Sequence, residues 1–123
     1  MLAGIAVAGA GRTAAEARRP AVVEARSGGG RVLVWGLGHS SSGVPPSWQA
    51  TASRPGVWVT TLSPQDVAEL ARQVVAHKGP GDVAVASVHW GGNWGFQVLE
   101  EQRRFAHALI DTGGRRGLKA RPA

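Results

Sequence analysis

The sequence contains no cysteine and no tyrosine, and no run of apolar residues approaches the roughly 20 that a membrane-spanning helix needs. Disulfides, thiolate zinc sites, iron–sulfur clusters and cysteine nucleophiles are therefore excluded from these 123 residues. Acidic residues are also few, with 8 Asp and Glu against 14 Lys and Arg, so the formal net charge is +6. The length allows one domain.

The excess positive charge lies mainly at the C-terminal end. Residues 1–112 hold 10 basic and 8 acidic residues, whereas residues 113–123 hold four basic residues and no acidic one. A nucleic-acid-binding module instead spreads Lys and Arg over one folded face and interleaves them with aromatic residues. We therefore expect no nucleic-acid partner, and we expect residues 114–123 to form a disordered basic tail.

The first ten residues are apolar, but they lack the positively charged start of a signal peptide, and two glycines interrupt them. Because no signal peptide is evident, the cytoplasm is the default compartment. A short buried strand over Gly4–Ala8 explains the apolar residues better.

The remaining pattern predicts an α/β fold, a partial layered sheet with flanking helices. The segments Arg31–Leu37 and Asp82–His89 are apolar on both alternations, which is typical of strands covered on both faces in a mostly parallel sheet. Helices are predicted after Thr13, after Ser63 and over Leu99–Thr112, because capping residues precede the first two and apolar residues recur at helical spacing in the longer two.

His89 is the strongest candidate for a functional residue. It ends a predicted strand directly before a Gly-rich loop, which is where open α/β sheets place ligands and metal-binding groups. Trp90, Gly91, Asn93 and Trp94 follow it and could shape a pocket. The alternatives are a histidine hydrogen-bonded to the backbone at the strand end, and tryptophans that only pack the loop onto the sheet.

A second candidate segment is the Ser-, Gly- and Pro-rich stretch Gly38–Pro55. It is too long for an ordinary connection, and Trp48 argues that it is ordered. His39, Ser42 and Trp48 are its candidate contacts with a ligand.

The segment from Asp82 to Gly113, D-V-A-V-A-S-V-H-W-G-G-N-W-G-F-Q-V-L-E-E-Q-R-R-F-A-H-A-L-I-D-T-G, closely resembles the capsule synthesis protein CapA family. The family pattern is a strand ending in Ser-x-His-Trp-Gly, a loop, and a helix with Glu-Gln-Arg and Ala-His-x-Leu-Ile-Asp-x-Gly. The stretches A-G-I-A-V-A-G-A-G-R and S-S-G-V-P-P-S-W are similar too, so the resemblance extends from Leu2 to Gly113.

The resemblance implies a role in poly-gamma-glutamate capsule biosynthesis and a remnant of a metallophosphoesterase-like αββα sandwich, with residues 1–113 as a partial CapA-like domain. The resemblance leaves the cell envelope open as the location of the intact family, and it suggests the acidic capsule polymer or its precursors as partner. It also implies a site for two divalent metals, of the manganese, iron or zinc type, to which His89 contributes one ligand. The family's other ligand motifs do not occur in this sequence. The resemblance therefore implies a metal-dependent hydrolase for the intact family, and we expect these residues alone to bind no metal and to be inactive.

The sequence departs from the family pattern after Gly113, where another buried strand of the type Ala-Asp-Val-Val is expected. Codons can be chosen for residues 113–118 such that, when the DNA is read one base later, it encodes Ala-Asp-Val-Val. This motivates the hypothesis of a fragment ended by a frameshift, which the coding DNA tests. A sheet without its expected neighbours should expose apolar edges, so self-association or aggregation is predicted.

A different function class remains open. The Ser/Gly/Pro loop and the tryptophans could form a noncatalytic module that binds a glycan or an acidic polymer without metal. Binding that persists in EDTA would favour this alternative.

Overall fold

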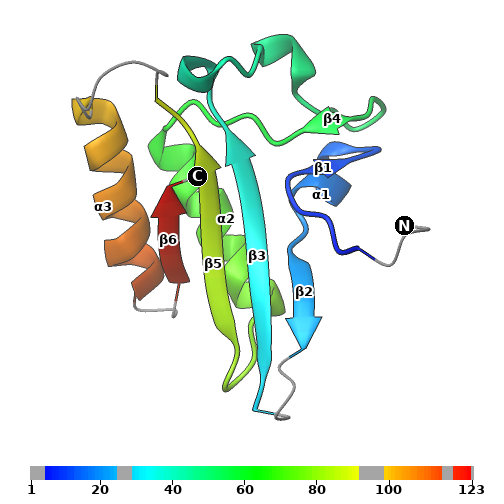
Figure 1. The fold of residues 1–123 in the computed structure, drawn as a ribbon, viewed down its shortest axis with the longest axis vertical. Helices are drawn as coiled ribbons and strands as arrows, with labels where there is room; N and C mark the ends of the chain where they lie inside the picture. The colour runs from blue at the N-terminus through cyan, green and yellow to red at the C-terminus, as the bar shows by residue number, and fades with distance from the viewer. Residues whose placement is uncertain (1–4, 25–28, 92–98, 115–117, 123) are drawn as a thin grey trace.

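The computed structural model describes residues 5–24, 29–91, 99–114 and 118–122, and for residues 113–114 and 118–122 it describes the backbone only. Two short 3-10 helices, Ser40–Ser42 and Pro46–Trp48, lie in the loop after β3. The other elements, shown in Figure 1, are β1 (Ala10–Gly11), α1 (Ala14–Ala17), β2 (Ala21–Glu24), β3 (Arg31–Gly38), β4 (Gly56–Val57), α2 (Pro64–His77), β5 (Val83–His89), α3 (Glu100–Gly114) and β6 (Leu118–Pro122).

The main sheet has four strands in the order β2-β3-β5-β6. β3, β5 and β6 are parallel, and β2 runs antiparallel to β3 at one edge. The prediction of a mostly parallel α/β sheet is therefore confirmed. β1 and β4 form a separate antiparallel pair.

The hydrophobic core lies between one face of this sheet and the helices. In Figure 1, α2 lies behind β3 and β5, and α3 lies beside β6. Every second residue of β3 and β5 points into the core, so the inward positions are buried and the alternate positions are half-buried or exposed. The core residues are Leu33, Trp35, Leu37, Trp58, Val67, Leu70, Val74, Ala84, Ala86, Val88, Phe105 and Leu109.

The expectation that β3 and β5 are covered on both faces is wrong for the described part of the chain. On the opposite face Val32, Val34 and Val85 are half-buried, and Val83 is 43% exposed. The structure is a mixed α/β fold, while the metallophosphoesterase-like sandwich stays an expectation of the resemblance.

The predicted buried strand over Gly4–Ala8 is also wrong for its described residues. Residues 5–8 are irregular, with Ile5 65% and Val7 45% exposed. The chain turns at Gly9, which has a φ of +80°, and passes over Gly36 of β3 instead of joining the sheet. A short apolar run does not encode a partner strand, which explains the error.

The structure also differs from the prediction that residues 114–123 form a disordered tail. Leu118–Pro122 form β6, which pairs in parallel with β5. The strand expected after Gly113 therefore has a counterpart at that place in the sheet. α3 returns the chain to the amino end of β5. The edge of β5 carries unpaired backbone groups there, so the segment that follows α3 can pair with them regardless of its side chains. The tail prediction relied on the scarcity of large apolar side chains in residues 114–123. Pairing through the backbone does not require such side chains.

The helix after Ser63 is confirmed. The Ser63 hydroxyl accepts a hydrogen bond from the Asp66 amide at 3.3 Å, and Pro64 is the first helical residue. Among the described residues, no helix is both long and apolar enough to cross a membrane.

Candidate functional site

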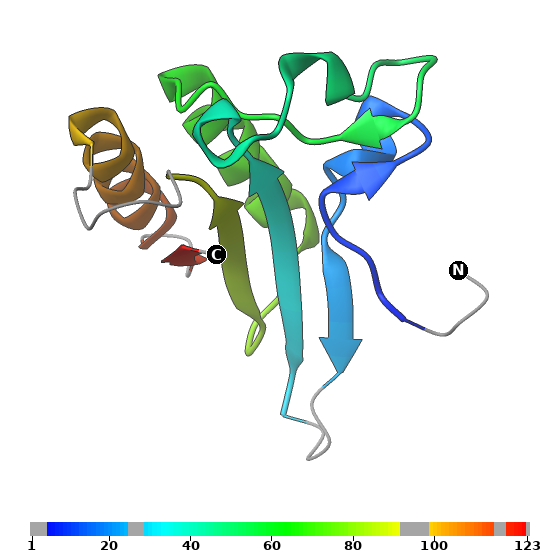
Figure 2. The same ribbon diagram turned by 45° about the horizontal axis from the view of Figure 1, so that its top comes forward.

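The carboxyl ends of β3 and β5 lie together. Gly38 pairs with His89 in the strand register, and the His39 amide donates to the His89 carbonyl at 3.0 Å. Figure 2 shows the loop that follows β3 crossing over this end of the sheet. The edge at which α/β sheets bind ligands thus carries His89 and is bordered by the Ser/Gly/Pro loop.

A pocket of about 330 Å³ opens at this edge, on the face of the sheet away from α2. Ser87 and His89 both line it, because they are two residues apart on one strand. Trp48, whose side chain is 57% exposed, contributes from the loop. The remaining lining residues are Ala8, Gly9, Gly36, Leu37, Gly38, Val44 and Val57.

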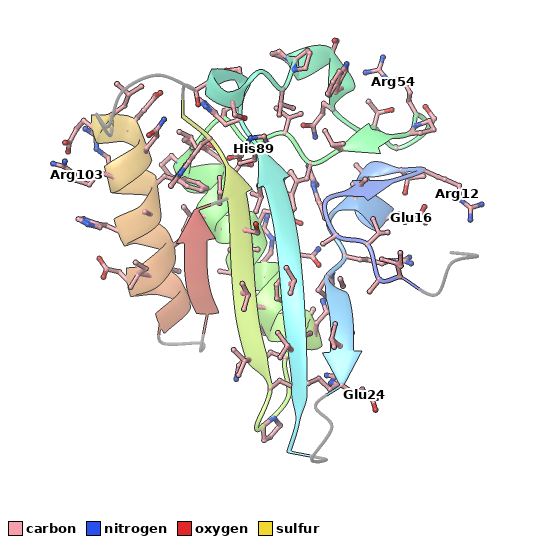
Figure 3. All side chains as sticks on the ribbon, viewed as in Figure 1. Arg12, Glu16, Glu24, Arg54, His89 and Arg103 are labelled. Atoms are coloured by element: carbon pink, nitrogen blue, oxygen red, sulfur yellow. The ribbon has the colours of Figure 1, made fainter. Side chains whose placement is uncertain are left out.

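Close contacts explain why Gly9 and Gly38 in this pocket are glycines. A Cβ at Gly9 would lie 2.7 Å from the Gly36 carbonyl oxygen, and a Cβ at Gly38 would lie 3.0 Å from Val44 Cγ2. The segment before β1 and the loop after β3 can therefore approach the sheet and form the pocket walls. In Figure 3, His89 lies at the end of the strands, beneath that loop.

His39 and Ser42, two predicted ligand contacts, are instead engaged with the backbone. The Ser42 hydroxyl lies 2.9 Å from both the His39 and the His89 carbonyl oxygens and shares its one proton between them. His39 is buried, and its Nδ1 accepts from the Ser41 amide at 3.2 Å. Neither residue lines the pocket, but both donate hydrogen bonds to the His89 carbonyl.

The segment after His89 packs against α3. The Trp90 ring lies edge-on to Phe105, with 6.1 Å between ring centroids, and Gly91 has a φ of +86°. Neither Trp90 nor Gly91 lines the pocket, so the structure favours packing for Trp90. Asn93 and Trp94 lie outside the described residues.

The strongest electrostatic feature lies at the other end of the same strands. Asp82 accepts hydrogen bonds from the Arg31 side chain, at 2.7 and 3.2 Å, and from the amides of Arg31 and Gly79. These hydrogen bonds hold the pKa of the Asp82 carboxyl well below its usual range. The pair fixes the amino ends of β3 and β5 and thereby the register that brings Gly38 beside His89.

The described residues do not fit a two-metal centre. They contain no group of three or more His, Asp or Glu side chains that could hold a metal ion. His89 is the one ionisable side chain among those that line the pocket. The described pocket therefore offers one metal-ligating side chain, His89, and one hydroxyl, that of Ser87. Together with the indole of Trp48, these groups suit hydrogen bonding and stacking.

Sequence reasoning missed both Ser41 and Ser87. Ser87 shares a face with His89 by the two-residue alternation of the strand, which the sequence does show. Ser41 lies in a run of three serines, and nothing local distinguishes it from its neighbours.

A second groove, of about 430 Å³, lies between α2 and α3. Its lining is mainly apolar, with Glu101 and Arg104 as its charged residues. It provides no comparable set of groups for chemistry.

Comparison with known proteins identifies the family. The model of the bacterial capsule synthesis protein family PGA_cap matches residues 2–115. The chain belongs to this family. Two curated relatives, from Mycobacterium tuberculosis strains CDC 1551 and H37Rv, are each described as a probable polyglutamine synthesis accessory protein. Each is 47% identical over 113 residues, which cover 90% of this chain and 30% of the relative.

The resemblance to CapA proteins is thus confirmed at the level of the family. The chain spans about 30% of the length of these relatives. The matches do not favour the alternative of a free-standing glycan-binding module.

Proposed function

We propose that this PGA_cap chain acts in the synthesis of a capsule polymer built from glutamate or glutamine units, and that the pocket at His89 contacts the polymer or its precursor. The observation that carries the proposal is the position of His89, Ser87 and Trp48 in one pocket at the carboxyl ends of β3 and β5. The relatives' description as polyglutamine synthesis accessory proteins supports the class of polymer.

The charge of the chain is consistent with an acidic partner. A net charge of +6 attracts a polyanion, but that attraction is unspecific and weakens with salt. The pocket itself offers an imidazole, a hydroxyl and an indole. Contacts made in the pocket should therefore persist at salt concentrations that abolish binding by net charge alone.

We also propose that these 123 residues do not hydrolyse phosphoesters on their own, although the resemblance implies a metal-dependent hydrolase for the intact family. Two-metal hydrolysis needs several carboxylate and imidazole ligands that converge on one place. The described residues contribute His89 to such a set.

The hydrolase proposal is tested with bis(p-nitrophenyl) phosphate and Mn²⁺. We expect no hydrolysis above that of the His89→Ala variant. His107→Ala is a matched control, because His107 is exposed on α3 and does not line the pocket. Manganese-stimulated hydrolysis that is lost in His89→Ala and kept in His107→Ala would overturn the proposal.

We propose self-association from exposed apolar residues on the open face of the sheet and in the segment before β1. Val23 and Val83 lie on that face and are 53% and 43% exposed, and Ile5 and Val7 of the segment before β1 are 65% and 45% exposed. Exposed apolar surface beside an edge strand promotes pairing between chains. Sedimentation velocity should show a mass that rises with protein concentration, whereas a monomer at all concentrations would contradict this.

A further inference from the structure

The turn His39–Ser42 contacts the main chain of the candidate site at two points. Ser42 Oγ lies 2.9 Å from the His89 carbonyl oxygen, and the Gly91 amide donates to Ser41 Oγ at 2.8 Å. The two contacts lie on either side of Trp90. The backbone from His89 to Gly91 is therefore held at both ends by neighbouring serines of one turn.

We propose that Ser41 and Ser42 are positioning residues, which set the direction in which the chain leaves β5 and so fix the His89 imidazole in its pocket. The inference rests on the proposed function of that pocket. It assigns a role to two side chains that do not themselves line the pocket.

Ser41 joins two parts of the structure through hydrogen bonds. Its amide donates to His39 Nδ1 at 3.2 Å, so the imidazole caps the start of the turn. Ser41 Oγ lies 2.7 Å from the same Nδ1 and accepts from the Gly91 amide. The Ser41 hydroxyl thus links the His39 imidazole to the Gly91 amide, and buried His39 anchors the turn.

Ser42 acts on the strand end itself. The His89 carbonyl receives the His39 amide at 3.0 Å and the Ser42 hydroxyl at 2.9 Å. Two donors on one carbonyl fix the orientation of the peptide that follows His89. Gly91, with its φ of +86°, then allows the chain to turn away toward α3.

The same loop also forms a wall of the pocket. Val44 and Trp48 follow the turn by a few residues and line the pocket together with His89. One segment therefore both places the wall and orients the strand end, which explains why a long Ser/Gly/Pro loop is ordered here. Trp48 and His89 keep their relative position through this shared support.

Ser40 provides a matched control. It belongs to the same 3-10 helix, is exposed, and its hydroxyl makes no hydrogen bond to the described residues. Ser40→Ala therefore removes the same atom from the same turn without affecting the hydrogen bonds that Ser41 and Ser42 make to the backbone of His89 and Gly91. Ser41→Thr and Ser42→Thr keep the hydroxyl and serve as rescue variants.

The experiment measures two local quantities on the full chain by NMR and chemical modification. A lost hydrogen bond of about 1 kcal/mol corresponds to roughly fivefold faster exchange, so the Gly91 amide should exchange about fivefold faster in Ser41→Ala. The rate at which diethyl pyrocarbonate modifies His89, divided by the rate for exposed His107 in the same molecule, should change at least twofold in Ser42→Ala. Both values should return in the Thr variants and stay unchanged in Ser40→Ala.

A purely structural role would lower global stability without changing the modification ratio between two histidines of the folded protein. Unchanged Gly91 exchange and an unchanged His89 ratio in both Ala variants would overturn the inference. Neither measurement uses a ligand, so the inference can fail or stand separately from polymer binding at the pocket. A shifted ratio with no polymer binding by the wild type would refute the proposed function alone.

Discussion

Phe105 joins the helical layer to the segment that follows His89, so its removal tests the packing beneath the site. Its side chain is 2% exposed, and its ring meets Trp90 edge-on with an interplanar angle of 73°. A buried phenyl side chain removes about 200 Å² from water, worth ~5 kcal/mol as an upper estimate. Phe105→Ala should therefore lower the free energy of unfolding by about 3–5 kcal/mol.

That loss is a large part of the roughly 5–15 kcal/mol that stabilises a typical domain. Urea unfolding followed by far-ultraviolet circular dichroism measures it. Ile110→Ala is the matched control, because Ile110 lies on the same helix but is 49% exposed, and its cost should stay within about 0.5 kcal/mol. A cost below about 1 kcal/mol for Phe105→Ala, or equal costs for the two variants, would refute the packing described here.

Three further perturbations test other parts of the structure. The pKa of Asp82 lies below its unfolded value, so the ionised carboxylate stabilises the folded state above about pH 4, and this contribution is lost as the pH falls. The melting temperatures of wild type and Asp82→Asn should therefore converge toward pH 2. A difference that stays constant with pH would contradict this. A Cβ at Gly56 would lie 2.3 Å from the Trp48 carbonyl oxygen, whereas one at Gly43 (φ +90°) would meet no atom within 4 Å. Gly56→Ala should therefore lower the urea midpoint more than Gly43→Ala, which carries only the roughly 1–2 kcal/mol of backbone strain; the reverse order contradicts the loop packing. Ser63→Ala removes the N-cap of α2 and should cost about 1 kcal/mol in the same assay, and no loss would show that the cap is replaced.

The elements that the sequence predicted well are those whose signals are local. The helix after Ser63 combines a capping residue, a proline and an apolar stripe within one segment, and α2 runs over Pro64–His77. β3 and β5 agree with their predicted ranges within one residue at each end. Their apolar runs predicted strands correctly but predicted cover on both faces, because a run of valines and alanines does not reveal how many layers pack on it.

The errors concern pairings between distant segments. β6 has the composition of a disordered tail, yet it pairs with β5 because α3 delivers it to an open edge. For the site, sequence position identified His89 and the loop around Trp48, and the structure places both residues in one pocket. The link from Ser41 to Gly91 spans 50 residues and leaves no local pattern, so only the fold reveals it.

The most direct test of the central claim, that the pocket at His89 contacts the polymer, is chemical-shift mapping with poly-γ-glutamate oligomers. The chain is labelled with ¹⁵N and titrated in EDTA at about 0.15 M salt, where exposed charges are screened beyond roughly 8 Å. We expect the largest shifts at the amides of Gly36, Gly38, Ser87 and His89 and at the indole of Trp48. Shifts confined to the groove between α2 and α3, or to the basic C-terminal residues, would contradict the claim.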